Sequence, residues 1–288
     1  MNIDGNRPQQ RLLAFDTSTS SLAVAVMENG SLLAEQNIHA ERNHSAYLVT
    51  AIEEALEAAG ITKQELNGIA VGVGPGSYTG IRIAVTTAKT LAWALKIPVF
   101  GISSLEATAL GAWAKETGQD TAALGAYAMG DRSRVADATE ESSAAAGTTA
   151  SAREHWIIPL VDARRGQVYT ALFSAQDNTL THRLEQDGIR LMDRWIEQIA
   201  ELLQTYAPED RPEGIWIVGD VALHEAAAEA LRPLMGDRLH IVSYELEGIW
   251  MGIAGTARSQ SGVGDDVHAI EPNYTQLAEA EAKRLRNA

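Results

Sequence analysis

The 288-residue sequence predicts an α/β fold made of two similar halves. Three observations support this: strand-like and helix-like patterns alternate, their order recurs in the second half, and a stretch rich in Ala, Ser, Thr and Gly lies between the two. We expect a first domain at 1–110, an insertion at 111–155 and a second domain at 156–288. The insertion has few large apolar residues to offset its ordering entropy, so we expect it to be mobile.

The first half begins with two apolar strand patterns, one over Arg11–Asp16 and one from Ser21 onwards. Asn29-Gly30 predicts a hairpin turn into a third strand, because both central residues of this turn need a positive φ. Apolar residues at helical spacing then predict two helices, each preceding a short strand. The first half therefore reads βββαβαβ, with the later elements at His44–Gly60, Gly68–Val73, Ile81–Leu95 and Pro98–Ile102.

The second half repeats this order from Trp156 onwards, with Asp162 in the place that Asp16 has in the first half. The repeat is one of topology and not of residue identity. Its remaining strands are expected at 179–185, 214–220 and 238–243, and its helices at 191–206, 221–234 and 247–260. Two such halves in tandem predict the duplicated ribonuclease-H-like architecture of actin-like ATPases (the ASKHA fold).

Composition excludes several classes of protein. The chain has 23 basic and 38 acidic side chains, a net charge of −15, and no cysteine. The missing cysteine excludes disulfides, thiolate zinc sites and a cysteine nucleophile. The acidic balance argues against nucleic-acid binding over a broad surface. Because we find neither a signal sequence nor an apolar run long enough for a membrane span, we expect a cytoplasmic protein without membrane contact.

Two loops are candidates for phosphate binding. One follows the first strand and contains Asp16, Thr17 and Ser18; the other is GVGPGSYTGIR, where Gly74 and Gly76 precede a helix whose free N–H groups favour an anion. The second loop matches neither a P-loop nor a dinucleotide fingerprint. The alternative is purely structural: an Asx or hydroxyl turn after the first strand, and a tight strand-to-helix connection in the second loop.

The sequence shows no evident catalytic set. Its histidines lack metal-ligand spacing, and the nucleophile motifs G-x-S-x-G and S-x-x-K are absent. The helix Ile81–Leu95 is unusual because Arg82 and Lys89 are its only charges, so it reads as apolar nearly all round. An apolar face of that size is typical of a surface that another protein covers.

Several of these segments resemble the bacterial TsaB (YeaZ) family of tRNA threonylcarbamoyladenosine biosynthesis. The specific segments are LLAFDTSTSSLAVAV, RNHSAYL and GVGPGSYTGIRIAVTTAKTLAWAL within about residues 11–110, and VDARRGQVY and EPNYTQ match more loosely. The resemblance implies the duplicated actin-like fold and a non-catalytic relative of the transferase TsaD. TsaD binds metal through an H-x-x-x-H pair, and Ser104 and Thr108 stand in its place here, so we expect neither a metal nor a catalytic site.

The resemblance also implies partners. The chain would bind and activate TsaD through its two N-terminal helices, within a complex that transfers threonylcarbamoyl to the adenosine next to the anticodon of tRNA. TsaE would join this complex, the isolated chain would form a homodimer, and tRNA would be reached only through the complex. The chain would have no cofactor of its own, and ATP or ADP at the interface with TsaD is left open. The expected partner-binding residues are His44, Leu48, Ile52, Tyr78, Arg82, Ile83, Val85, Ala88, Lys89 and Ala92.

This reading makes Ala88→Asp a test: the variant should lose TsaD while staying folded. Two other functions are kept open. An independent actin-like ATPase or small-molecule kinase would use Asp16 and the glycine loop for Mg-ATP, with Asp162 as a candidate base that Arg164 and Arg165 could equally pair with. A metalloprotease would need a ligand pair that the sequence does not offer.

Overall fold

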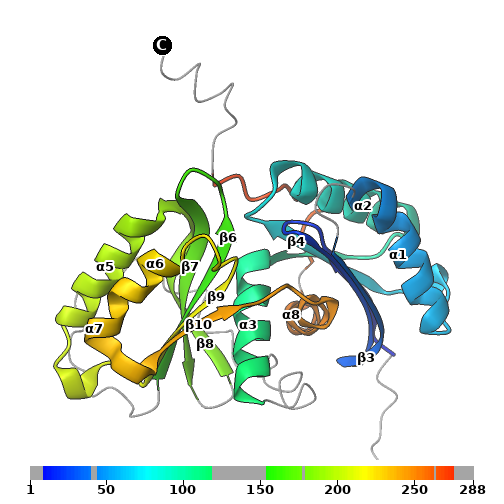
Figure 1. Ribbon diagram of the computed structural model, residues 1–288. Coiled ribbons are helices and arrows are strands. Elements are labelled where there is room, and N and C mark those ends of the chain that lie inside the picture. Colours follow the sequence, from blue (N-terminus) through cyan, green and yellow to red (C-terminus); the bar gives the residue numbers. More distant parts are fainter. Residues whose placement is uncertain (1–8, 40–43, 119–153, 177–178, 263, 276–288) are drawn as a thin grey trace, which may run out of the picture. The chain divides into compact units, whose positions relative to one another are not determined.

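The computed structural model describes residues 9–39, 44–118, 154–176, 179–262 and 264–275 (Figure 1). These residues form two compact units, each built on one five-stranded sheet. The first unit takes the described residues of 1–73, 78–102 and 247–272, and the second takes those of 74–77, 103–246 and 273–288. No helix in these ranges is long and apolar enough to cross a membrane.

The sheet of the first unit has the strand order β3-β2-β1-β4-β5. Its strands are β1 (Arg11–Asp16), β2 (Ser21–Glu28), β3 (Ser31–His39), β4 (Gly68–Gly74) and β5 (Val99–Ser103). The central strand β1 runs antiparallel to β2 and parallel to β4. A short 3₁₀ turn, Lys63–Glu65, precedes β4.

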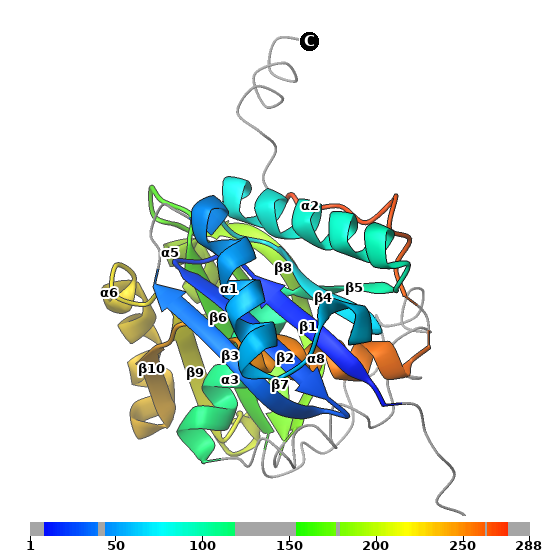
Figure 2. The ribbon, with the colours of Figure 1, turned by 90° about the vertical axis from the view of Figure 1, so that its right-hand side faces the viewer.

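Helices cover both faces of this sheet. Helices α1 (His44–Ala58) and α2 (Tyr78–Leu95) lie on one face, and α8 (Gly248–Gln260) lies on the other (Figures 1 and 2). Because successive side chains of a strand point to opposite faces, Leu13 and Phe15 of β1 enter the core beneath α1 and α2. Leu12 of the same strand lies on the α8 side.

The second unit repeats this arrangement, with the strand order β10-β9-β6-β7-β8. Its strands are β6 (Glu154–Asp162), β7 (Gln167–Gln176), β8 (Thr179–Leu191), β9 (Gly214–Gly219) and β10 (Leu239–Ser243). Here β6 corresponds to β1, since it is antiparallel to β7 and parallel to β9. Helices α5 (Met192–Gln204), α6 (Glu225–Ala228) and α7 (Arg232–Met235) cover one face, and α3 (Ser104–Thr117) covers the other (Figure 1).

The two sheets confirm the duplicated α/β fold predicted from the sequence. The prediction for 221–234 is wrong: a single helix does not form there, and α6 and α7 are short and separated by the 3₁₀ turn Glu229–Leu231. Pro233 contributes to the break because it has no backbone N–H for a continuous helix. The third strand of the second half is also longer than expected and reaches Leu191.

Helix α3 was not predicted as a separate element. Residues 111–117 of the expected insertion are helical, and Trp113 is almost fully buried. Residues 119–153 of that insertion lie outside the described residues, and Glu154 begins β6. An α-helix that is buried on nearly every side shows no amphipathic period, so its sequence is easily mistaken for an unstructured Ala-rich stretch.

Helices α3 and α8 also fall in units other than the sequence order suggests. Helix α3 follows β5 in the chain but packs on β6 and β9 of the second sheet. Helix α8 follows β10 but packs on β1 and β2 of the first sheet. Each unit therefore contains the last helix of the other half, and the boundary of the first unit lies at residue 102 and not at 110.

Candidate functional site: phosphate loops and a partner-binding face

The turn after β1 uses polar groups of its own in hydrogen bonds within the protein. Asp16, Thr17 and Ser18 are all buried. The backbone N–H of Ser18 donates to Asp16 Oδ1 at 2.5 Å, and Thr17 Oγ1 donates to the carbonyl oxygen of Gly80 at 2.7 Å. A Cβ on Gly72 would lie 1.7 Å from Asp16 Oδ2, so the carboxylate rests directly on the backbone of β4. In this arrangement the Ser18 amide and the Thr17 hydroxyl both donate to groups of the protein itself.

Two polar atoms beside this turn have no hydrogen-bond partner among the described residues. They are Ser18 Oγ and His44 Nδ1, and both are buried. Burial lowers the pKa of His44, although a hydrogen bond to the Thr19 backbone and the charge of Asp16 oppose the shift. His44 is therefore a neutral core histidine near neutral pH.

The second candidate loop is held by α3. Gly74 and Gly76 are buried, and Gly74 has a φ of +89° that favours glycine. The Gly74–Pro75 peptide bond is cis. The N–H of Gly74 donates to Ser104 Oγ at 3.1 Å, so this amide is already satisfied.

Ser104 and Thr108 lie one helical turn apart at the start of α3, and both are buried. Ser104 Oγ accepts the Gly74 amide, and Thr108 Oγ1 donates to the carbonyl oxygen of Ser104 at 2.8 Å. These hydroxyls are local hydrogen-bonding groups and offer no imidazole nitrogen. Within the described ranges, no group of three or more His, Asp or Glu residues has an arrangement that could hold a metal ion.

Asp162 at the end of β6 has a histidine as its partner. His224 Nε2 lies 3.0 Å from Asp162 Oδ1, and the Asp162 amide donates to Asp220 Oδ2 at 3.0 Å. Burial raises the pKa of Asp220, which the Asp162 amide opposes. The sequence left open a pairing of Asp162 with Arg164 or Arg165, but the described contact is with His224.

Six of the expected partner-binding residues lie inside the first unit. They are at most 7% exposed and form or border the core between the helices and the sheet: His44, Leu48, Ile52, Val85, Ala88 and Ala92. A partner could not contact them without opening the unit. Tyr78 and Arg82 are exposed, and Ile83 and Lys89 are half-buried.

Lys89 is already used within the chain. Its Nζ donates to the carbonyl oxygens of His268 and Ile270, each at 3.0 Å, and so holds the segment after α8 against the side of α2. Lys89 is thus a positioning residue for this segment. The prediction that it contacts a partner is not supported by this geometry.

The outer face of α2 consists of hydroxyl and aromatic side chains with one charge. Tyr78, Arg82, Thr86, Thr90 and Trp93 are exposed along it. The expectation of a helix that is apolar nearly all round is therefore wrong, because Thr86 and Thr90 line its outer face. Arg82 Nη1 donates to the Tyr78 hydroxyl at 2.8 Å, so even this charge has a partner within the helix.

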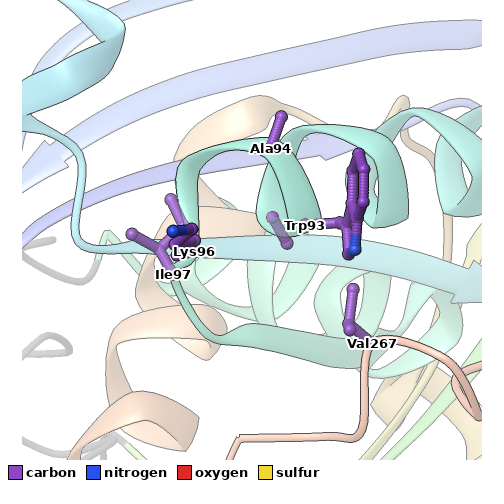
Figure 3. Close-up of a pocket in the computed structure, with 6 residues that line it drawn as sticks. Trp93, Ala94, Lys96, Ile97 and Val267 are labelled. Carbon is purple, nitrogen blue, oxygen red and sulfur yellow. The ribbon is translucent and has the colours of Figure 1, made fainter.

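Thr86, Thr90 and Trp93 lie on this face but are absent from the sequence-based list, and Trp93 is the largest of the three. It is 67% exposed, which is unusual for so large an apolar side chain. Figure 3 shows it beside Val267 at a pocket of about 450 Å³ that Ala92, Ala94, Lys96 and Ile97 also line. The C-terminal end of α2 therefore presents an exposed aromatic side chain next to an open apolar hollow.

Comparison with known proteins identifies the family. The chain is 31% identical to the tRNA threonylcarbamoyladenosine biosynthesis protein TsaB of Bacillus subtilis, over 96% of this chain and 98% of the relative. The chain belongs to the TsaB family. It is also 28% identical to the Escherichia coli TsaB protein over 62% of each chain. A family model described as TsaD, tRNA N6-adenosine threonylcarbamoyltransferase, matches residues 34–154.

A solved structure has the same fold. YeaZ from Pseudomonas aeruginosa superposes with a TM-score of 0.62 at 21% identity, covering 92% of this chain and 99% of that one. The TsaB family and the duplicated α/β fold predicted from the sequence are thus confirmed. The match to a TsaD model over part of the chain shows that the TsaB-family chain shares sequence features with the transferase.

Proposed function

We propose that this TsaB-family chain is a non-catalytic subunit that binds and activates the TsaD transferase in tRNA threonylcarbamoyladenosine biosynthesis in the cytoplasm. The family name places it in this pathway. The observation that carries the proposal is the outer face of α2, where Trp93 is 67% exposed on the same side of the helix as the exposed Thr86 and Thr90. Exposed aromatic residues are common anchors of protein interfaces because their burial releases much water.

Neighbouring side chains extend this face. Helix α1 packs beside α2 on the same side of the sheet (Figure 2). Its Tyr47 and Val49 are 46% and 56% exposed. The six buried residues of the original list support this surface from beneath, because they fix both helices on the sheet. We therefore propose that TsaD contacts the outward side chains of these helices and not the six buried residues.

The chemistry of the remaining candidate sites supports a non-catalytic role. Ser104 and Thr108 are buried hydroxyls that bond to neighbouring backbone groups. Asp16 is buried, and its Oδ1 is bonded to the Ser18 amide. The alternative, an independent ATPase or kinase, would need this turn to open before it could meet a nucleotide phosphate. ATP hydrolysis by the isolated chain that Asp16→Ala abolishes would favour that alternative.

Trp93→Glu tests the proposed interface. The variant removes an aromatic anchor that the complex would bury and places an unpaired carboxylate in the interface. Both changes should weaken association with TsaD, together by about 30-fold or more. Leu223→Glu is the matched control, since Leu223 is 81% exposed in the second unit and gains the same charge. Isothermal titration calorimetry with purified TsaD measures the affinity, and tRNA threonylcarbamoylation by the mixed proteins measures the activation. Equal affinity of Trp93→Glu and the control would refute this interface.

Ala88→Asp is not a clean version of this test. Ala88 is fully buried between α2 and the sheet, so a carboxylate there would be desolvated inside the monomer. We expect this variant to unfold the first unit, which would abolish binding for any interface. The burial of Ala88 therefore argues against the expectation that this variant stays folded.

The other partners belong to the same proposal. We infer that the isolated chain forms a homodimer through the α1–α2 face, because that face is free when TsaD is absent. TsaE then joins the complex of the two proteins, tRNA is bound through the complex, and a nucleotide, where present, lies at the contact with TsaD. Light scattering should give a monomer for Trp93→Glu and a dimer for the wild type.

A further inference from the structure

The hairpin between β6 and β7 carries two adjacent arginines in an uncommon conformation. Arg164, Arg165 and Gly166 have φ values of 65°, 56° and 71°. Left-handed backbone suits glycine and is disfavoured for arginine, whose Cβ crowds the following carbonyl oxygen. The hairpin therefore keeps two side chains that its own backbone geometry does not favour.

Both guanidinium groups are exposed and have no hydrogen bond or ion pair with the described residues. This sets them apart: every other arginine in the described ranges makes a side-chain hydrogen bond. Arg183, for example, bonds to Glu106 at 3.2 Å, and Arg232 bonds to Glu229 at 2.8 Å. In a chain with a net charge of −15, two free neighbouring arginines are a marked exception.

The acidic residue at the base of the hairpin does not neutralise them. Asp162 Oδ1 lies 3.0 Å from His224 Nε2, and the Asp162 amide is bonded to Asp220. The local structure thus directs this carboxylate to His224 and leaves the arginine pair available. The backbone keeps the tip in place, since the Gln167 amide donates to the Arg164 carbonyl oxygen and the Met192 amide to that of Gly166.

We propose that Arg164 and Arg165 contact the phosphate backbone of tRNA when the chain is part of the modifying complex, an inference that rests on the proposed function. Guanidinium groups match phosphate oxygens in charge and in hydrogen-bond geometry. An acidic subunit repels tRNA over most of its surface, so a contact has to be local and carried by charges that the protein itself leaves unpaired. The hairpin tip is such a place.

The double variant Arg164→Asn/Arg165→Asn tests this contact without damage to the hairpin, because Asn tolerates left-handed backbone well. The control Lys63→Gln/Arg194→Gln removes two exposed positive charges elsewhere. Fluorescence anisotropy of labelled tRNA with the assembled complex should show about fivefold weaker binding near 0.15 M salt for the double Asn variant only. The slope of log affinity against log salt should fall by nearly two, since each lost phosphate contact removes roughly 0.9.

Assembly of the complex is measured first, as the molecular mass of the mixed proteins. A wild-type chain that fails to assemble with TsaD refutes the proposed function and the tRNA contact with it. If the double Asn variant assembles normally but binds tRNA with unchanged affinity and salt slope, only the tRNA contact is refuted. Loss of assembly in a folded double Asn variant would show that the hairpin contacts a protein, which also overturns the inference. An unfolding midpoint no lower than that of the wild type checks the fold.

Discussion

The close approach of α8 to the first sheet makes Gly255→Ala a sharp test of the fold. A Cβ on Gly255 would lie 2.3 Å from the Cβ of Ala70 in β4. Both atoms are attached directly to backbone, so neither can rotate away as the end of a long side chain could. The helix would have to move away from the sheet, or the strand would have to shift.

Two opposing effects set the size of the change. Gly to Ala inside a helix ordinarily stabilises by about 1 kcal/mol. Overpacking of a rigid core costs about 1–3 kcal/mol, and we take the upper end because the overlap is between two fixed methyl groups. The expected net effect is therefore a loss of about 2 kcal/mol in the free energy of unfolding. A loss in the free energy of unfolding would indicate that α8 packs tightly on the sheet, whereas a gain would indicate a loosely attached helix.

Ala70→Gly supplies the matching control. Alone it should cost about 1 kcal/mol, because glycine weakens a strand. In the double variant the overlap is gone, so stability should return to nearly that of the wild type, with a coupling of about −3 kcal/mol between the sites. Urea unfolding of all four proteins measures this cycle. Stabilisation by Gly255→Ala, or additive effects in the double variant, would refute the packing of α8 on β4.

Three further predictions follow from individual contacts. Gly72→Ala would push a methyl group into the Asp16 carboxylate and break its bond to the Ser18 amide, so urea unfolding should show a loss of roughly 3 kcal/mol or more. Lys89→Met removes both bonds to the segment after α8, so amide exchange should speed up at 268–270 while the core of the sheet stays protected. Burial lowers the pKa of His155, so the neutral side chain contributes its full stability above about pH 6.5, and this contribution is lost as the pH falls further. The free energy of unfolding should therefore differ less between about pH 7.5 and pH 5.5 in His155→Gln than in the wild type. Urea unfolding followed by tryptophan fluorescence measures this difference.

Much of the fold could be predicted from the sequence because its strands have strong local signals. The buried run of β1, the Asn29-Gly30 turn and the alternation in β2 each predict one structure with little competition. Helix α3 had no such signal: it is buried on nearly every side and therefore lacks a period. The positions of α3 and α8 could not follow from order along the chain, because each packs on the sheet of the other half.

The candidate site was harder to predict for a related reason. The low number of charges singled out α2, and the resemblance to the TsaB family implied α1 as well. An apolar side chain, however, gives the same sequence signal whether it faces the chain's own sheet or another protein. Val85, Ala88 and Ala92 face the sheet, while Trp93, next in sequence to Ala92, points outward. The signal that could have separated them is the spacing of Thr86, Thr90 and Trp93, which marks the outer stripe of the helix.

The split between inward-facing and outward-facing side chains explains why α2 carries so few charges. Its alanines allow the helix to lie close on the sheet, and its exposed threonines are neutral groups that are less costly to desolvate than the Lys and Glu side chains usual on an outer helix face. A surface of that kind can be covered and uncovered at low cost, and Trp93 gives it an anchor. The proposed interface thus consists of a few outward side chains, and the buried residues Val85, Ala88 and Ala92 hold the helix that carries them on the sheet.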